Sequence, residues 1–235
     1  MADQYTEKEI IIKDIICKLD AGKLQAGDRL PTESELAAQY GISKTNIHLG
    51  IQQLERLGFV RVVPRHAIYI SSPEGLTLEA IDALFKYLDQ IPSRPVIEAL
   101  LEMRRMMGMS LIKSLTSNQK PDIVAQFHIL LDQLDAAIET GDQNTREQAL
   151  LDLLSFLYRN AGNALFPVLV RSLRNSMTQA VHYISLYADP QEMIRVYRSM
   201  EQHAVKGDSD KAVQVWYAWN EKLTQVFLRG LYGDQ

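Results

Sequence analysis

The sequence contains a single cysteine, Cys17, among its 235 residues. One thiol excludes an internal disulfide framework and any cysteine-based zinc cluster. No stretch approaches the roughly 20 consecutive apolar residues that a membrane helix needs, and the polar segment Met1–Lys8 lacks the apolar core of a signal peptide. The composition, 46% hydrophobic and 23% charged, is that of an ordinary globular protein. We therefore expect a cytoplasmic protein with one large domain or two modest ones.

The motifs of common enzymes are also missing. The sequence has no P-loop, no Gly-x-Ser-x-Gly elbow and no dinucleotide-binding fingerprint. Cys17 falls on the apolar side of the first predicted helix, where a core residue is more typical than a nucleophile. We therefore predict no catalytic residue and no cofactor.

An excess of positive charge, the simplest sign of a nucleic-acid partner, is absent as well. The formal net charge is −4, and residues 1–75 hold nine Lys and Arg against ten Asp and Glu. Between Ser34 and Ile70, however, four basic residues stand against two acidic ones. Because only the face that meets the phosphates matters, this weakly basic stretch is compatible with DNA binding.

Three helices are predicted in the first 60 residues. Apolar residues recur at helical spacing from about Thr6 to Asp20. The capping box Thr32–Glu35 opens a second helix, which Gly41 ends. Ser43 caps a third helix, which Gly58 ends.

Two β-branched runs follow the third helix, Phe59–Val63 and Ala67–Ile70, and they flank the short segment Pro64–His66. Their composition and length are typical of a β-hairpin. The order of helix, helix, tight turn, helix and hairpin predicts a winged helix-turn-helix, with three helices and a hairpin wing.

Residues Ser71–Gly75 form a turn-rich linker, after which the pattern changes. From Leu76 onward no convincing strand pattern occurs, and the helical periodicity predicts a bundle. The predicted helices cover residues 77–90, 95–117, 121–140, 144–160, 163–188, 190–206 and 208–231. The sequence thus predicts a mainly α protein with a winged helix-turn-helix domain over residues 1–72 and an all-helical domain over residues 76–235.

The third helix begins with short hydrogen-bonding groups and one cation, in the run Ser43–His48. In helix-turn-helix proteins these positions reach base edges and phosphates in the major groove. Asn can pair with adenine, Lys with guanine, and Ser or Thr with phosphate. Winged helices also serve as protein-docking modules, and polar residues early in a helix can simply be caps, so that alternative stays open. The candidate DNA-binding residues are Arg29, Thr32, Ser34, Ser43, Lys44, Thr45, Asn46, His48, Arg65 and His66.

Three segments, Gly27–Ala37, Tyr40–Thr45 and Leu54–Val60, resemble the N-terminal signature of the GntR family of bacterial transcription regulators. In that family a Leu-Pro-Ser/Thr-Glu turn leads into the second helix, and a Ser/Thr-Arg-Thr-Thr-Val-Arg run opens the recognition helix. The resemblance spans roughly residues 5–70 and implies that a dimer binds operator DNA.

Several residues depart from the family pattern. Lys44 and His48 stand where Arg is usual, Ser34 replaces a frequent Arg, and the wing reads Pro64–Ile68 instead of a glycine-containing run. Because Arg and Lys are not equivalent at a bidentate site, we expect an operator that differs from the commonest family sequence.

The helical half resembles the FadR-type effector domain of the same family, the FCD domain. The similarity rests on Leu101–Arg105, on Tyr158–Asn163 and on Gly207-Asp208 before the last predicted helix. Many such domains bind a metal through one Asp and three His. In this sequence the corresponding positions hold Leu150, Leu154, Tyr197 and Trp219. None of these side chains is an ordinary zinc ligand, so we predict no metal.

A metal-free branch of the FCD domain binds acyl-CoA, and the pair His182-Tyr183 is similar to that branch. An acyl chain needs a long apolar cavity. The methionines between residues 103 and 109 could line one, although they fall all round their helix and are more typical of core or dimer contacts.

Arg104 is a cation on a largely apolar helix, which is costly unless the charge is paired. Two interpretations stay open: it binds a ligand carboxylate or phosphate, or it forms a salt bridge with a neighbouring helix. The candidate effector-binding residues are Arg104, Asn163, His182, Tyr183 and Trp219.

Together these features predict a homodimeric transcription regulator, by default a repressor. Its affinity for pseudo-palindromic operator DNA would be controlled by a small-molecule effector, a carboxylate or an acyl-CoA, bound without metal in the helical domain. The alternative is a DNA-binding or protein-docking dimer with a degenerate effector pocket.

Overall fold

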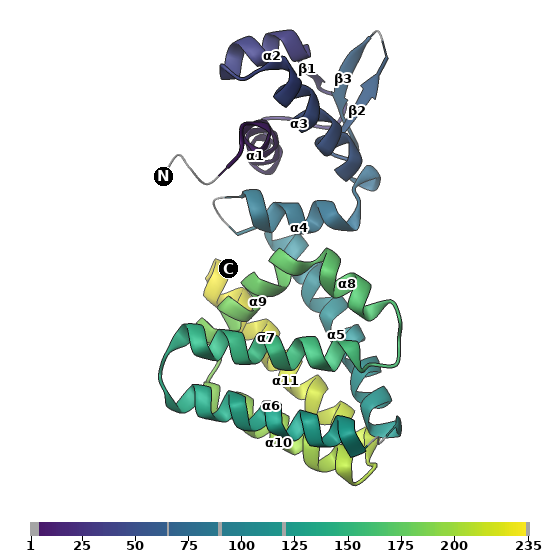
Figure 1. Cartoon of the computed structure of the whole chain (residues 1–235), viewed down its shortest axis with the longest axis vertical. Helices are drawn as coiled ribbons and strands as arrows, with labels where there is room; N and C mark the ends of the chain where they lie inside the picture. Colours follow the sequence, from purple (N-terminus) through teal and green to yellow (C-terminus); the bar gives the residue numbers. More distant parts are fainter. Residues whose placement is uncertain (1–4, 65, 89–90, 119–120, 234–235) are drawn as a thin grey trace. The chain divides into compact units, whose positions relative to one another are not determined.

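The computed structural model of this protein describes residues 5–64, 66–88, 91–118 and 121–233. Its internal contacts divide the chain into two compact units, Met1–Ser93 and Arg94–Gln235 (Figure 1). Each unit has its own cluster of buried apolar side chains. The predicted fold class, a winged helix-turn-helix followed by a helical bundle, is confirmed.

The first unit combines α-helices with a small antiparallel sheet whose strand order is β1-β3-β2. Its helices are α1 (Glu7–Asp20), α2 (Glu33–Tyr40), α3 (Lys44–Leu57) and α4 (Leu78–Tyr87), with a 3-10 turn at Pro73–Gly75. Its strands are β1 (Arg29–Leu30), β2 (Val60–Val63) and β3 (Ala67–Ile70).

The predicted ends of the second and third helices are confirmed. The Thr32 hydroxyl accepts a hydrogen bond from the Glu35 amide at 3.3 Å, and the Ser43 hydroxyl accepts one from the Asn46 amide at the same distance. Gly41 and Gly58 follow α2 and α3 in the left-handed conformation, with φ of 66° and 86°. Glycine adopts this conformation without the steric cost that other residues meet.

Helix α3 packs closely on α1 because position 50 has no side chain. A Cβ atom on Gly50 would lie 2.4 Å from Cγ2 of Ile11 and 3.0 Å from the carbonyl oxygen of Lys8. Ile11 and Ile47 are fully buried in this contact region of the core. The close approach holds the apolar side of α3, the predicted recognition helix, against α1.

The β2–β3 hairpin is the predicted wing, with Val60 opposite Ile70 and Val63 opposite Ala67. The two-residue strand β1 was not predicted from the sequence. It pairs Arg29 with Tyr69 on the other edge of β3. Two residues are too short a run for an alternating pattern to show, so only the pairing with β3 identifies them as a strand.

Helix α4 packs against the other helices of the first unit and belongs to that unit. Ala80, Ala83 and Tyr87 belong to its core cluster, and the Thr77 amide donates to the Leu57 carbonyl at 3.0 Å. The contacts therefore divide the chain after Ser93, whereas the predicted domains divide it between residues 72 and 76. Those domain limits stay a prediction.

The second unit is all-helical in its described part. Its helices are α5 (Arg94–Asn118), α6 (Pro121–Glu139), α7 (Gln143–Arg159), α8 (Phe166–Ser172), α9 (Arg174–Tyr187), α10 (Pro190–Val205) and α11 (Ser209–Tyr232). Helices α6 and α7 run side by side, α10 lies against α6, and α11 lies along α5 and α10 (Figure 1). None of the described helices combines the length and apolar character that crossing a bilayer requires.

The prediction of one helix over residues 163–188 is wrong. The structure has two helices, α8 and α9, separated at Leu173, whose backbone leaves the helical region at φ −108° and ψ 35°. Leu173 is buried at the break. No proline or glycine marks this position, and the apolar periodicity continues through it. The sequence therefore gives no local sign of the break.

Glu9 ties α1 to α4 and gives the first testable prediction. Its carboxylate accepts hydrogen bonds from Lys86 at 2.5 Å and from the Tyr87 hydroxyl at 3.1 Å. The bond with Lys86, opposed by partial burial and helped by Thr6, lowers the pKa of Glu9 from 4.5 to about 2. A depressed folded-state pKa contributes stability above pH 4.5 that is lost as the pH falls toward 2.

We expect Glu9→Gln, which keeps the capping-box geometry and removes the charge, to lower the urea midpoint at pH 7. The difference from the wild type should narrow as the pH falls below 4.5. Circular dichroism measures the midpoint, and hydrogen exchange of α1 and α4 assigns the change to the first unit. The control is Glu79→Gln, an exposed acid on α4. A midpoint difference that stays constant with pH would contradict the role of this charge.

Candidate nucleic-acid interface and effector site

Helix α3 has one buried and one exposed face. Ile47, Ile51 and Leu54 are fully buried against the rest of the first unit. On the opposite side, Lys44, Thr45 and His48 are exposed, together with the capping residue Ser43. The packing therefore presents the start of α3 to solvent, as the predicted role in the major groove requires.

The first turn of α3 is electrostatically suited to a phosphate. It carries no acidic residue, and in the described part of the chain Lys44 forms no ion pair. The free amides at a helix N-terminus add partial positive charge. The cation and the helix end thus act in the same direction.

Two carboxylates from neighbouring helices hold the other polar side chains of this turn. The Asn46 amide group donates to Glu7 of α1 at 2.5 Å, and Nδ1 of His48 lies 2.7 Å from a carboxylate oxygen of Glu33 of α2. Asn46 therefore has its carbonyl oxygen left to accept a bond from a base. Sequence reasoning missed Glu7 and Glu33, because no spacing rule relates residues that meet only through packing.

The remaining candidate DNA-binding residues are exposed where the structure describes them. Arg29 lies on β1, Thr32 and Ser34 at the start of α2, and His66 on the wing. Thr32 is also the N-cap of α2. Arg65 lies outside the described residues.

In the second unit, Arg104 of α5 lies among polar and aromatic groups from three other helices. Its Nη1 donates to the amide oxygen of Asn220 of α11 at 2.9 Å. Its guanidinium carbon is 5.4 Å from the ring centroid of Trp216, within the range of a cation–π contact. Burial raises the pKa of Tyr197 to about 12, and the nearby charge of Arg104 opposes this shift at both Tyr197 and Tyr158.

This arrangement leaves polar atoms buried without partners. Nη2 of Arg104 and Nε1 of Trp216 have no hydrogen-bond partner among the described residues. One interpretation of Arg104 from the sequence was a salt bridge with a neighbouring helix. Among the described residues Arg104 forms no such salt bridge, and its hydrogen-bond partner is the neutral Asn220. A buried N–H group that forms no hydrogen bond costs folding free energy. The two groups are therefore suited to donate hydrogen bonds to an anionic or carbonyl oxygen of a ligand.

The other predicted effector residues lie in different surroundings. Asn163 is exposed before α8, where its side-chain oxygen accepts from the Leu165 amide at 2.9 Å. Nδ1 of His182 lies 2.9 Å from a carboxylate oxygen of Glu147, and Tyr183 stacks with Tyr187. Trp219 is buried in the core of the unit. Their roles in effector binding stay predictions.

The residues at the metal-ligand positions of the family do not fit a metal. The four side chains are buried in one apolar core cluster and are Leu150, Leu154, Tyr197 and Trp219. Within the described residues, no group of three or more His, Cys, Asp or Glu side chains is arranged to hold an ion.

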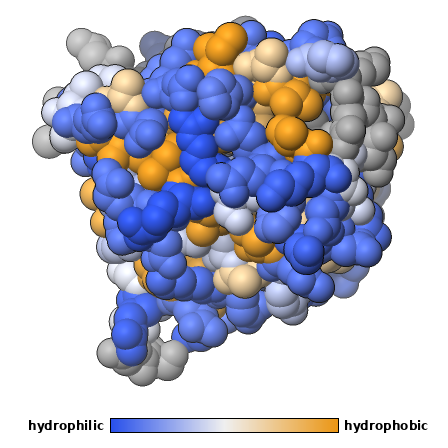
Figure 2. All heavy atoms as spheres, turned by 90° about the horizontal axis from the view of Figure 1, so that it is seen from below, coloured by the Kyte–Doolittle hydropathy of each residue, from blue (hydrophilic) through white to orange (hydrophobic). Residues whose placement is uncertain are grey.

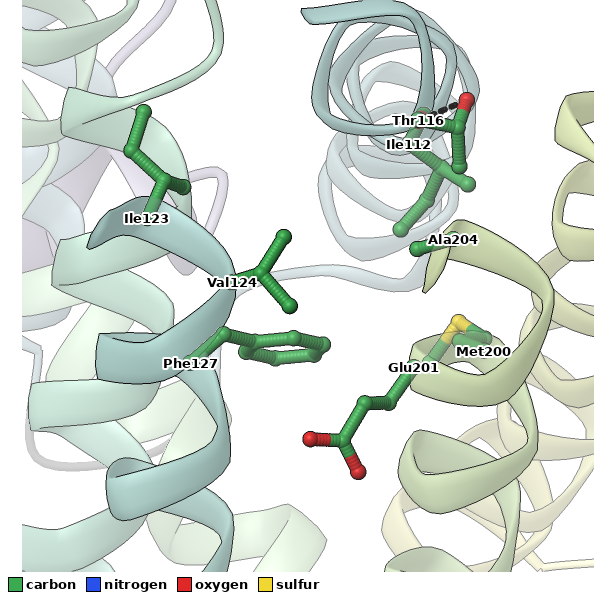
Figure 3. Close-up of a pocket in the computed structure, with 8 residues that line it drawn as sticks. All are labelled: Ile112, Thr116, Ile123, Val124, Phe127, Met200, Glu201 and Ala204. Atoms are coloured by element: carbon green, nitrogen blue, oxygen red, sulfur yellow. Dashed lines mark hydrogen bonds between the residues drawn. The ribbon is translucent and has the colours of Figure 1, made fainter. Parts of the chain in front are cut away.

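An apolar pocket lies where α5, α6 and α10 meet. Figure 3 shows Ile112 and Thr116 from α5, Val124 and Phe127 from α6, and Glu201 from α10 on its walls. Its volume of about 20 Å³ is enough for roughly one water molecule. This pocket is too small for an acyl chain, and none of the methionines between residues 103 and 109 lines it.

Two family models match the chain. Residues 8–70 match the gntR family of bacterial regulatory proteins, and residues 99–220, more than half of the chain, match the FCD domain. This protein belongs to the GntR family. It is a DNA-binding regulator with a metabolite-sensing FCD domain.

Two relatives of this GntR regulator are distant in sequence. An HTH-type transcriptional regulator of Mycobacterium tuberculosis is 23% identical over 208 residues, which cover 88% of this chain and 83% of that protein. An arabinose metabolism transcriptional repressor of Geobacillus stearothermophilus is 22% identical over 124 residues, which are 51% of this chain but only 34% of the repressor. This chain therefore matches about a third of that second relative.

Solved structures share the fold of this GntR regulator. The Listeria monocytogenes regulator Lar matches with a TM-score of 0.61 at 15% identity, covering 96% of this chain and 98% of Lar. McbR of E. coli matches with a TM-score of 0.52 at 16% identity, covering 97% and 99% of the two chains.

The Arg104–Asn220 pair of the GntR regulator gives a second prediction. Asn220→Leu should lower the free energy of unfolding by about 2 kcal/mol, because it leaves a partly buried cation without its hydrogen-bond acceptor. Arg104→Met/Asn220→Leu should recover most of this loss, since replacing both partners by apolar groups is often neutral or stabilising. Urea unfolding followed by tryptophan fluorescence reports on the second unit, which holds both tryptophans. Additive losses in the double variant would show that the pair is not coupled.

Proposed function

We propose that this protein is a homodimeric repressor that binds a pseudo-palindromic operator through α3 and the wing. An anionic small molecule, held at Arg104 without metal, changes its affinity for that operator. The partly buried guanidinium of Arg104, whose buried Nη2 has no hydrogen-bond partner among the described residues, carries the proposal for the effector. The exposed start of α3, whose own first turn holds no acidic residue, supports the proposal for DNA.

The guanidinium of Arg104 favours an effector that carries a carboxylate or phosphate group. A guanidinium binds both anions through parallel N–H bonds, and Nη2 of Arg104 has such a donor to offer. The apolar pocket between α5, α6 and α10 accommodates roughly one water molecule. Arg104 does not line this pocket, which is too small for an acyl chain.

A dimer is expected because two winged helices match two operator half-sites. The second unit exposes several large apolar side chains that could contribute to a subunit interface, namely Met106, Ile129, Leu165, Val168, Leu186, Tyr187, Val205 and Tyr217. On the face shown in Figure 2, hydrophobic residues form patches interrupted by hydrophilic ones. The effector can act only by binding the DNA-competent and DNA-incompetent dimers with different affinity.

The proposal for DNA is tested by selecting the full-length protein against a randomised duplex library at about 150 mM salt, a physiological ionic strength. We expect an enriched inverted repeat. Recovery of unselected sequence, with binding that disappears as salt rises, would overturn specific DNA recognition and favour a protein-docking role for the winged helix.

Lys44→Ala provides a sharper test at single-residue level. If Lys44 contacts a phosphate, the variant should weaken binding to all duplexes alike and reduce the salt slope by about 1. Fluorescence anisotropy across a salt series measures both quantities. Lys23→Ala, which removes the same charge from an exposed position outside α3, is the matched control. Loss of discrimination at one base pair only would instead show that Lys44 reads a base.

The effector proposal is tested with succinate, citrate and palmitoyl-CoA as probes of the full-length protein. We expect a short anion to raise the melting temperature and to change operator affinity, and Arg104→Met to abolish both effects. Arg105→Met is the control, because Arg105 already pairs with Glu221 at 3.5 Å. A response to palmitoyl-CoA alone would contradict the small-anion effector, and no response to any of the three probes would favour a degenerate pocket.

A further inference from the structure

A second basic site lies in the second unit, in a groove of about 440 Å³ between α7 and the α8–α9 pair. Three arginines line it: Arg159 at the end of α7, Arg171 on α8, and Arg174 at the start of α9. Its walls also include Tyr158 and Met177. The volume is in the range of small-molecule sites, which is roughly 300–1,000 Å³.

The positive charge of this groove is not compensated within the protein. All three arginines are exposed, and among the described residues none of them forms an ion pair with a carboxylate. The acidic group on the same lining is Asp152, which accepts a hydrogen bond from Gln148 at 3.0 Å. Three guanidinium groups against one carboxylate are unusual in a chain whose net charge is −4.

The geometry and charge indicate the chemistry of the occupant. A phosphoryl group carries up to two negative charges and three acceptor oxygens, and guanidinium groups bind it through paired N–H bonds. The aromatic and thioether side chains of Tyr158 and Met177 offer apolar surface beside this charge. We propose that the groove binds the phosphoryl group of a small phosphorylated metabolite, whose organic part packs on Tyr158 and Met177.

This site is distinct from the one at Arg104 and goes beyond the proposed function. Arg104 does not line the groove. Tyr158 lines the groove and lies near Arg104: burial raises the pKa of Tyr158, and the charge of Arg104 opposes this shift. The arginines of the groove are nevertheless different residues from Arg104, so each site can be tested with its own substitutions.

Isothermal titration calorimetry of the full-length protein with AMP, ribose 5-phosphate and inorganic phosphate, at fixed ionic strength, tests the site. We expect both organic phosphates to bind more tightly than inorganic phosphate. Arg171→Ala/Arg174→Ala should weaken their binding by about tenfold or more, which corresponds to about 1.4 kcal/mol or more, because it removes two of the three guanidinium groups of the groove. Arg159→Ala should have a smaller effect in the same direction.

Two controls separate this proposal from the others. Arg195→Ala removes an exposed arginine of α10 outside the groove and should leave binding of AMP unchanged. Arg104→Met removes the other proposed anion site, and the groove should still bind AMP in this variant. Loss of AMP binding in Arg104→Met alone would assign the phosphate to the interior site and overturn the groove. Equal affinity for inorganic and organic phosphates would show a simple anion site.

The oligomeric state supplies a further readout by sedimentation velocity. The groove variants should sediment as the wild type does. Variants that change the monomer–dimer equilibrium while binding of AMP is unaffected would show that the groove is a subunit interface, and the metabolite proposal would then be wrong. If the wild type bound none of the three phosphate probes, the metabolite proposal would also be wrong.

Discussion

The metabolite-sensing unit depends on how one partly buried charge is accommodated. Arg104 forms a hydrogen bond with neutral Asn220 and lies over the ring of Trp216. Trp216 comes this close to α5 because residue 108 is glycine: a Cβ atom there would lie 2.2 Å from three atoms of the indole ring. These contacts hold the guanidinium in place but do not neutralise it. An apolar side chain at position 104 would pack at lower cost, so the charge does not serve the stability of the core and supports the proposed anion site.

The DNA-binding unit uses packing in a comparable way to present α3. Gly50 lets α3 approach α1, and that approach brings Glu7 within hydrogen-bond distance of Asn46. Each carboxylate beside the recognition helix lowers the attraction to phosphate but restricts the rotamers of the side chain it holds. The two carboxylates would thus reduce the affinity for DNA while they hold the side chains of Asn46 and His48 in defined positions. Lys44 is left as the unrestrained cation of the first turn.

Most of the fold follows from local signals in the sequence. The capping residues Thr32 and Ser43 and the left-handed glycines Gly41 and Gly58 predicted the ends of α2 and α3. The break at Leu173 and strand β1 could not be predicted, since both arise from long-range packing and pairing without a local marker. The same holds for the site. Arg104 was identifiable as a charge on an apolar helix, whereas Asn220 and Tyr197 join it only through the arrangement of α10 and α11.

A guanidinium site in place of a metal site would change how an FCD domain responds to its surroundings. An effector that is held by a bound metal is released when the metal is removed. Its affinity also falls when the His side chains that hold the metal become protonated. Arginine stays charged at every physiological pH and needs no ion. The pH dependence of anion binding at Arg104 would therefore follow the titration of the anion itself. With Leu150, Leu154 and Trp219 at the positions of metal ligands, the proposed site at Arg104 would respond to the concentration of an anion without depending on a bound metal.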